Sequence, residues 1–421
     1  MLLAAYARLN PAEKRDALAT LASRALYAKD LLASVESKKV AVTDLTADLV
    51  RQMRNLKNED VDAQIVAVWG VVRDTPEEKA KLIAHYRQLV LSQPARPDDL
   101  PLGRAVFVKT CQQCHTLFGV GAKIGPELTG SNRADLNYLL SNVLDPSAVM
   151  AREYIPTVFL TTGGRVITGL VREETKNALT VVTANETVVI PRDEIEEQKL
   201  GDKSMMPDDL LKPLSDSEVR ALVAYLSSPG QVAVLATPDN LTTFFNGKDL
   251  AGWEGNSDLW RVENGEIVGT SKGLARNEFL VNHLLLGDFR LSLNVKLVPN
   301  AGNSGIQFRS EALPRGEVKG YQADIGVGWW GKLYEEHGRE LLWKESGEKH
   351  VRIDDWNRYE IVAAGSRLKT FINGKPCVDL DDPAGARRGI IAFQLHSGGP
   401  FEVRFKDFDL ELNPKVETAG K

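Results

Sequence analysis

The spacing of apolar residues changes along the chain and divides it into three parts. Up to residue 92 the apolar positions recur at helical spacing, as in Leu45, Leu49, Met53 and Leu56. The stretch Asn10-Pro11-Ala12-Glu13 has the residues of a helix start, with a capping Asn, a Pro at the first position and a Glu at the third. Residues 1–92 therefore predict short helices in series, a HEAT-like helical segment. A simple helical cap on the part that follows is the alternative.

The second part, residues 98–229, combines both spacings. Helical stripes precede residue 111 and recur from Ser215, whose capping partner is Glu218. Between these helices lie four runs rich in Val, Ile and Thr, separated by Gly and Asn turns, at residues 154–162, 165–173, 179–184 and 187–191. We therefore expect two helices that enclose a small β insertion at about 154–200.

The third part, residues 236–413, is β-rich throughout. Seven strands are expected, at residues 289–298, 304–310, 321–327, 359–364, 368–372, 390–394 and 403–412. Asn373-Gly374 is a strong hairpin turn. Many strands with regular turns predict an all-β sandwich of two sheets. The whole chain is thus expected to be a multidomain α+β protein.

Composition changes this picture little. A length of 421 residues is compatible with about three domains at ~150 residues each. The net charge of −5 argues against a general nucleic-acid binder. No stretch is long and apolar enough to predict a membrane span.

The clearest chemical motif is Cys111-Gln112-Gln113-Cys114-His115, which has the spacing of a c-type haem attachment site. The two thiols can form thioethers to one porphyrin, and the adjacent imidazole can bind the iron. A zinc site or a redox dithiol is the alternative. Zinc would need further ligands, but the only other cysteine is Cys377 and the next histidine is His283.

Two more features agree with a haem. The carbonyl of Pro126 could accept the second imidazole N–H of His115 and so orient the ring, although a plain turn proline would look the same. The distal ligand is expected in Ser204-Met205-Met206-Pro207, where we favour Met206 over Met205, with Met150 as an outsider.

These residues carry a resemblance. The haem motif, Gly125-Pro126, Leu144-Asp145-Pro146-Ser147, the β insertion and the Met205-Met206 loop resemble the haem-binding domain common in planctomycete and verrucomicrobial proteins. The resemblance implies a class I cytochrome c fold with one covalent haem c, ligated by His115 and one of the two methionines. Covalent haem attachment normally occurs outside the cytoplasm, so we expect a periplasmic or otherwise exported protein. The start lacks a signal-peptide pattern, and the chain is therefore expected to be a fragment of a longer protein or to have a misassigned start.

The third part carries a second resemblance. Phe245-Asn246-Gly247-Lys248-Asp249-Leu250, Asn303-Ser304-Gly305, Gly320-Tyr321-Gln322, Trp356-Asn357 and Gln394-Leu395-His396 are similar to the 3-keto-disaccharide hydrolase family. The resemblance implies a concanavalin-like jelly roll that acts on sugars oxidised at C3. The family often has Glu at the position of Gln322, which puts an acid–base role there in doubt.

Cleavage of a 3-keto-glycoside by elimination needs a base for the C2 proton, a donor to the enolate and an acid for the leaving oxygen. The acid–base candidates are Asp324, Glu345 and His396. The candidates that stabilise the enolate or donate a proton are Arg309, Lys332 and Tyr334. Asn303, Tyr321 and Gln322 complete the sugar-site candidates, and Trp329 and Trp330 are candidates for stacking on a sugar ring. Alternatively, Arg309 forms a structural ion pair with Asp324 and His396 ends a strand.

Three functions fit these patterns. The first is an electron-transfer cytochrome fused to an enzyme that cleaves 3-keto-glycosides, with a separate sugar dehydrogenase as its redox partner. The second is a non-enzymatic haem protein whose sandwich binds carbohydrate. In the third, the haem senses a gas or a redox state, which two tight axial ligands oppose.

Overall fold

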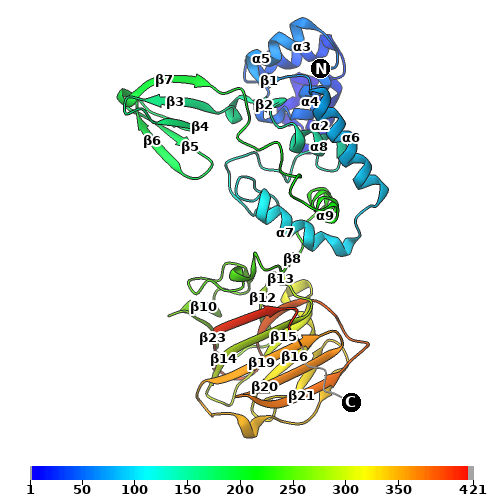
Figure 1. The fold of residues 1–421 in the computed structure, drawn as a ribbon, viewed down its shortest axis with the longest axis vertical. Coiled ribbons are helices and arrows are strands. Elements are labelled where there is room, and N and C mark those ends of the chain that lie inside the picture. The colour runs from blue at the N-terminus through cyan, green and yellow to red at the C-terminus, as the bar shows by residue number, and fades with distance from the viewer. Residues whose placement is uncertain (1, 416–421) are drawn as a thin grey trace. The chain divides into compact units, whose positions relative to one another are not determined.

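The computed structural model describes residues 2–415, which form two compact units that divide after residue 231 (Figure 1). The first unit contains every α-helix of the described residues, and the second is built from strands. The two-sheet sandwich expected from the sequence is confirmed in the second unit. No helix within residues 2–415 is both long and apolar enough to cross a membrane.

The first unit begins with a series of helices, and all but the last of them share one hydrophobic core. They are α1 (Leu2–Ala5), α2 (Pro11–Leu21), α3 (Ala25–Glu36), α4 (Ala47–Arg54), α5 (Glu59–Val68) and α6 (Glu77–Ser92). The predicted capping box at Asn10 and Glu13 is present. The core of α2–α5 also includes Ala148 and Val149, and β1 (Gly70–Val72) pairs with β2 (Val149–Ala151). The helical segment therefore packs against the part that follows it, and its HEAT-like arrangement stays a prediction.

Two helices on either side of the Cys111 motif cross closely. They are α7 (Leu100–Thr110) and α9 (Asp216–Ser227), both expected from the sequence, and α8 (Leu136–Leu144) lies between them in the chain. A Cβ on Gly103 would lie 2.0 Å from the carbonyl oxygen of Ala221, so only glycine permits this crossing. The cytochrome c arrangement that we infer from these helices stays a prediction.

The β insertion forms a five-stranded antiparallel sheet. Its strands are β3 (Thr157–Thr161), β4 (Val166–Glu174), β5 (Ala178–Val182), β6 (Thr187–Pro191) and β7 (Ile195–Leu200), in the order β6-β5-β4-β3-β7. Four of these strands were expected, and β7 was missed because its residues Glu196-Glu197-Gln198-Lys199 are all polar.

The second unit is a sandwich of two seven-stranded sheets. The first sheet has the order β10-β11-β23-β14-β19-β20-β21, and the second sheet has the order β18-β17-β16-β15-β22-β12-β9. In the first sheet the strands are β10 (Trp260–Glu263), β11 (Glu266–Ser271), β14 (Phe289–Val298), β19 (Asn357–Ala364), β20 (Arg367–Ile372), β21 (Lys375–Asp381) and β23 (Phe401–Leu412). In the second they are β9 (Trp253–Glu254), β12 (Glu278–Asn282), β15 (Asn303–Ala312), β16 (Val318–Gly326), β17 (Leu333–Glu336), β18 (Glu340–Trp343) and β22 (Ile390–Leu395). A short parallel pair, β8 (Val234–Leu235) with β13 (Leu284–Leu285), completes the unit.

The core of the sandwich lies between the two sheets. Phe393 of the second sheet stacks on Phe405 of the first, with ring centroids 4.0 Å apart. Apolar residues alternate with polar ones along β15 and β16, so one face of the second sheet covers this core and its other face carries polar side chains. The candidate site lies on that outer face.

Candidate functional site

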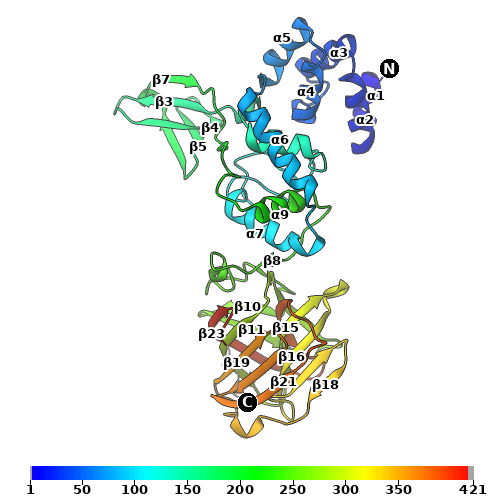
Figure 2. The ribbon, with the colours of Figure 1, turned by 45° about the vertical axis from the view of Figure 1, so that its right-hand side comes forward.

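The outer face of the second sheet carries a cluster of polar side chains, which we call the Asp324 face. Ile306, Ala323 and Ile325 point into the core, so the residues that alternate with them point outward. The Asp324 face consists of Asn303, Gln307, Gln322, Asp324, Lys332, Tyr334, Glu336, Gln394 and His396. They come from β15, β16, β17 and β22 and from residues next to these strands, and Figure 2 brings β15, β16 and β18 into view.

The register of three adjacent strands places Asp324 and Gln394 in one row. Gly305 of β15 is paired with Asp324 on one side and with Gln394 on the other. Because neighbouring strands lie about 4.8 Å apart, the Cα atoms of Asp324 and Gln394 are roughly 10 Å apart. Gly305 has no side chain, so the position between them is open to the side chains of its neighbours.

Asp324 is the most strongly perturbed acid on this face. Its side chain is buried, with 2% of the residue exposed, and Gln322 Nε2 donates a hydrogen bond of 2.7 Å to Oδ1. The pKa of Asp324 is raised to about 7, mainly by burial. The Gln322 hydrogen bond and Lys332 lower this pKa, whereas the charge of Glu336 raises it. The carboxyl group is therefore about half ionised at neutral pH and can either take or give a proton.

Several buried polar atoms of the Asp324 face lack a partner. Among residues 2–415, Asp324 Oδ2, Asn303 Oδ1 and both amide atoms of Gln394 have no hydrogen-bond partner. An unsatisfied buried polar group costs about 1–3 kcal/mol, and such groups concentrate where a ligand supplies the missing bonds. Three of these four atoms flank Gly305 in the row just described.

An exposed aromatic residue borders this cluster. Trp329 is 36% exposed, and the ammonium group of Lys332 lies 5.0 Å from the centroid of its ring. The Tyr334 ring meets Trp329 edge-on at 6.3 Å. Burial is the main cause that raises the pKa of Tyr334, so its hydroxyl stays protonated at neutral pH and can donate a hydrogen bond. Of the two predicted stacking residues, Trp329 is thus the one whose ring is exposed.

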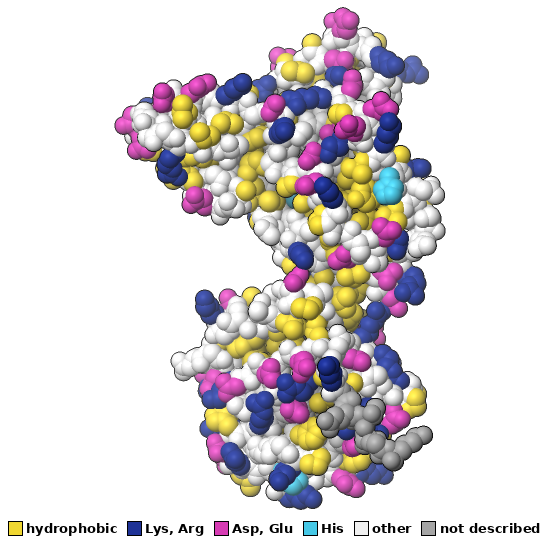
Figure 3. Space-filling view, in the orientation of Figure 1, with side chains coloured by type: hydrophobic (Ala, Val, Ile, Leu, Met, Phe, Trp, Pro, Cys, Tyr) yellow, Lys and Arg dark blue, Asp and Glu magenta, His cyan; other side chains and the backbone are white. Residues whose placement is uncertain are grey.

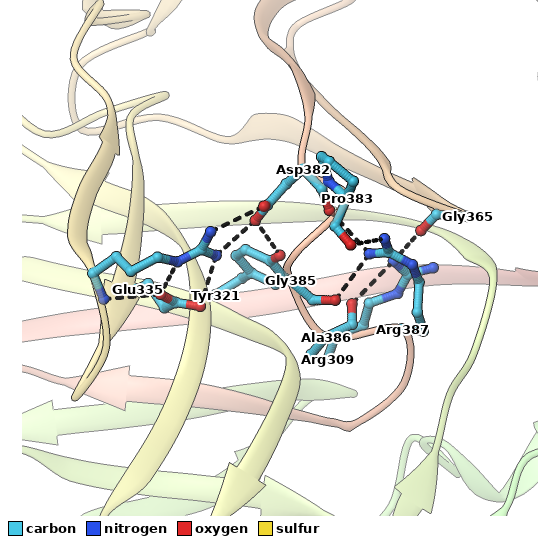
Figure 4. A network of polar contacts seen from close by, with 10 residues as sticks. Arg309, Tyr321, Glu335, Gly365, Asp382, Pro383, Gly385, Ala386 and Arg387 are labelled. Atoms are coloured by element: carbon cyan, nitrogen blue, oxygen red, sulfur yellow. Dashed lines mark hydrogen bonds and ion pairs between the residues drawn. The ribbon is translucent and has the colours of Figure 1, made fainter.

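Arg309 and Tyr321 lie in a different network, at a corner of the sandwich (Figure 4). Arg309 donates to the carbonyl of Gly365 at 2.7 Å and to Asp288 Oδ1 at 2.7 Å. Its acidic partner is thus Asp288, and the alternative pairing with Asp324 is wrong. The register of β15 shifts between Phe308 and Glu311, and Arg309, which lies at this shift, has a φ of 45°. The resulting β-bulge turns the Arg309 side chain away from the Asp324 face. Tyr321 points to the core side and donates to Asp382 Oδ2 at 2.5 Å.

Trp330 and Glu345 also lie outside the Asp324 face. Trp330 is buried, and its indole N–H donates to Asn300 Oδ1 at 2.9 Å, so it is a core residue and cannot stack on a sugar. Glu345 is exposed in the loop after β18. His396 follows β22 directly, and its Nδ1 lies 2.7 Å from the Ser397 carbonyl oxygen.

Three residues of the face were missed from the sequence, namely Gln307, Glu336 and Gln394. Gln307 and Gln394 are fully buried although both are polar, and Gln394 interrupts a strand whose other buried positions are apolar. That interruption was the available signal. Burial raises the pKa of Glu336, and its charge acts on Asp324 across the face.

The outer face of the first sheet differs in character. Figure 3 shows side chains of both charges gathered on this side of the second unit. Arg290 contacts Glu411 at 2.9 Å, and Arg404 contacts Glu266 at 3.0 Å, so the charges pair with each other. Paired surface charges of this kind are typical of a solvated face.

The Cys111 motif directly follows α7. His115 Nδ1 lies 2.8 Å from the Pro126 carbonyl oxygen, the contact expected for a proximal ligand, which leaves Nε2 to bind a metal. Burial lowers the pKa of His115 against the opposing effect of Pro126, so the imidazole is neutral at pH 7, as a metal ligand must be. A Cβ on Gly125 would lie 2.5 Å from His115 Cε1, so glycine is required beside the ring. Cys111 and Cys114 are both free thiols.

These features fit a c-type haem. The two thiols are not joined in a disulfide, and the imidazole is oriented and neutral. Met205 and Met206 are both half-buried, whereas Met150 is buried. The zinc alternative would need further ligands; within residues 2–415 no group of three or more His, Cys, Asp or Glu is arranged to hold a metal ion.

We expect Arg309 to stabilise the sandwich without a role on the Asp324 face. Its side chain is fully buried and donates to Asp288 Oδ1 and to the carbonyl oxygens of Gly287, Gly365 and Ala386. Arg309→Met should lower the free energy of unfolding by about 2–4 kcal/mol, because these acceptors lose their donor. Arg367→Met, which breaks an exposed ion pair with Asp379, should change it by less than about 1 kcal/mol. Equal denaturant midpoints for the two variants would contradict this role.

In the comparison with known proteins, one family model matches part of the second unit. Residues 240–411 match the family model of the 3-keto-alpha-glucoside-1,2-lyase-like domain. No curated protein matches the chain.

Three solved structures are similar to part of the chain. A putative glycosyl hydrolase from Parabacteroides distasonis is 18% identical over 42% of this chain and 98% of its own, with a TM-score of 0.32. The carbohydrate-binding module CBM66 from Bacillus subtilis is 16% identical over 38% of this chain and 95% of its own, with a TM-score of 0.31. A protein of unknown function with a galectin-like fold from Bacillus subtilis is 12% identical over 39% of this chain and 87% of its own, with a TM-score of 0.30. Residues 240–411 thus match the model of the 3-keto-alpha-glucoside-1,2-lyase-like domain, and in the structure these residues belong to the two-sheet sandwich.

Proposed function

We propose that the second unit cleaves glycosides whose sugar ring carries a ketone at C3, with Asp324 as the group that transfers the proton. The observation that carries this proposal is the state of the Asp324 carboxyl group. It is buried, one oxygen is fixed by Gln322, the other has no partner among residues 2–415, and its pKa is about 7. The family match of residues 240–411 supports the substrate class.

The chemistry follows from the ketone. The ketone acidifies the proton on C2, and the Asp324 carboxylate takes this proton while the C–H electron pair forms the enolate. The enolate then returns to a ketone, a C1=C2 double bond forms and the C1–O bond breaks. The proton on Asp324 passes to the departing oxygen, so the products are an unsaturated keto sugar and an alcohol. Addition of water across the new double bond would complete a hydrolysis.

Other residues of the face can assist these steps. Lys332 and the protonated hydroxyl of Tyr334 can donate to the enolate oxygen, which gains negative charge only after the proton is removed. Donors placed where charge develops favour the transition state over the substrate. The raised pKa makes the Asp324 carboxylate a stronger base than a solvated aspartate.

The test is to incubate the full chain with a 3-keto-glycoside in D₂O, and separately with the parent glycoside. We expect release of the alcohol from the keto compound only, together with deuterium at C2 of unreacted substrate if the first step reverses. Binding of either sugar without release would favour the carbohydrate-binding alternative and contradict cleavage.

We also propose that the first unit carries one covalent haem c on Cys111 and Cys114, with His115 and Met206 as iron ligands. The Pro126 contact, the free thiols and the glycine beside the imidazole support this. When bound, this haem would supply transfer of one electron at a time. We further propose export to the periplasm, where such haems are attached, and a sugar dehydrogenase as the electron donor. A spectroscopic assay of haem reduction by such a dehydrogenase and its sugar tests the pairing.

A further inference from the structure

Two buried glutamines form a hydrogen-bonded chain that ends on Asp324. Gln307 Nε2 donates to Gln322 Oε1 at 2.8 Å, and Gln322 Nε2 donates to Asp324 Oδ1 at 2.7 Å. The Ser310 hydroxyl lies 3.0 Å from Gln307 Oε1 and can donate to it. Gln307 and Gln322 lie opposite each other on β15 and β16, both buried.

The chain has one direction. An ionised carboxylate only accepts hydrogen bonds, so the Gln322 amide must present its nitrogen to Asp324 and its oxygen to Gln307. Gln307 must then present its nitrogen to Gln322, which leaves its oxygen for the Ser310 hydroxyl. Each amide is thereby fixed by the next one, and buried amides with satisfied bonds hold their positions rigidly.

A glycine makes room for this arrangement. A Cβ on Gly305, which lies opposite Asp324, would be 2.5 Å from Cδ of Gln322 and 2.9 Å from its Oε1. The Gln322 carboxamide can therefore lie across β15 only because residue 305 has no side chain. Gly305, Gln307 and Gln322 thus act on the same carboxyl group although only Gln322 touches it.

We propose that Gln322 is a positioning residue: held by Gln307 and accommodated by Gly305, it engages Asp324 Oδ1 and leaves Oδ2 as the one oxygen that transfers the proton. This inference rests on the proposed function, and it gives the Gln at position 322 a role other than acid–base catalysis. The unpartnered state of Oδ2 among the described residues agrees with it.

The proposal predicts how the carboxyl group titrates. The charged or titratable groups that act on Asp324 are Glu336, Lys332, Tyr334 and Tyr359, and none of them changes in the variants below. Gln322→Leu removes the N–H that stabilises the ionised carboxylate, so the pKa of Asp324 should rise. Gln307→Leu leaves Gln322 in place but frees its amide to turn, so the pKa should move in the same direction by less.

The titration can be followed in the full chain without substrate. Aspartate is labelled with ¹³C at the carboxyl carbon, and the Asp324 signal is identified by its absence in Asp324→Asn. We expect the midpoint to move from near pH 7 to roughly pH 8 in Gln322→Leu, because a hydrogen bond to a charged group contributes about that much. Ser292→Ala, which removes a buried hydroxyl from the first sheet, should leave the midpoint unchanged.

Turnover supplies the second readout. In Gln322→Leu, kcat/KM for a 3-keto-glycoside at pH 7 should fall by tenfold or more, and its pH profile should move up with the titration midpoint. Unchanged titration in both glutamine variants would overturn the positioning role even if the wild type cleaves the substrate. A wild type that titrates near pH 7 but releases no product would instead overturn the proposed function.

Discussion

Asp324→Asn should reduce kcat/KM for a 3-keto-glycoside by a factor of a hundred or more. A positioned general acid or base typically contributes 10²–10⁴-fold, and an amide cannot take the C2 proton. Asparagine has nearly the same shape as aspartate, and its Oδ1 can still accept the 2.7 Å bond from Gln322. The loss should therefore appear in kcat, with little change in substrate binding, when initial rates are compared by measuring the released alcohol.

The same substitution should change the pH dependence of stability. The pKa of Asp324 is raised from 3.8 to about 7 in the fold, so the folded state binds more protons than the unfolded state between these values. The stability that the protonated carboxyl contributes is present below pH 4 and is lost as the pH rises through 7. This loss amounts to about 4 kcal/mol at most. Denaturant titrations from pH 4 to pH 8 should show it in the wild type but not in Asp324→Asn.

Asp379→Asn is the matched control. Asp379 lies on β21 of the first sheet, half-exposed and paired with Arg367. Asp379→Asn should change the free energy of unfolding by less than about 1 kcal/mol and leave kcat/KM unaltered. An Asp324→Asn variant as active as Asp379→Asn would show that another group transfers the proton.

The sandwich could be predicted from sequence because its strands repeat a simple pattern. Strand β14 was expected at residues 289–298 and spans Phe289–Val298, and the turn Asn373-Gly374 has the positive φ values of 51° and 75° that this dipeptide favours. These features depend on local spacing and on backbone conformation. They are therefore visible without knowledge of the partners of each strand.

The Asp324 face could be predicted only in part. Asp324, Gln322, Lys332 and Tyr334 were selected by residue type, and alternation along β16 and β17 places them together. Arg309 was misplaced because a β-bulge, which has no clear sequence signal, reverses its side chain. Gln394 was missed because only the pairing of its strand places it in one row with Gly305 and Asp324. The register between strands that are far apart in sequence cannot be read from local sequence.

The first unit shows the same limit. Its helices were expected from helix caps and from the spacing of apolar residues. The packing of Ala148 and Val149 into the core of α2–α5, however, depends on contacts between residues that are far apart in the sequence. The His115–Pro126 contact was expected because the residues are only eleven apart and the motif constrains them. Short-range geometry was thus predictable and long-range packing was not.

Removal of both motif thiols should abolish covalent haem in the first unit. Cys111→Ser with Cys114→Ser leaves no sulfur to form a thioether, whereas Cys377→Ser, in the second unit, should have no effect on attachment. Protein produced with a haem-attachment system is separated on a denaturing gel and stained for haem peroxidase activity. We expect signal in the wild type and in Cys377→Ser and none in the double variant. A wild type without signal would contradict the haem proposal.

The axial ligands can then be separated by spectroscopy. Met206→Ala should lose the weak near-infrared sulfur–iron band and the high reduction potential typical of a methionine ligand. Met205→Ala should keep both, although the two side chains are equally half-buried. Met206 is favoured because its backbone N–H donates to Ser204 Oγ at 3.1 Å and Pro207 follows it, so its backbone is fixed on both sides. Loss of the band in Met205→Ala alone would transfer the ligand role to Met205 and leave the haem assignment intact.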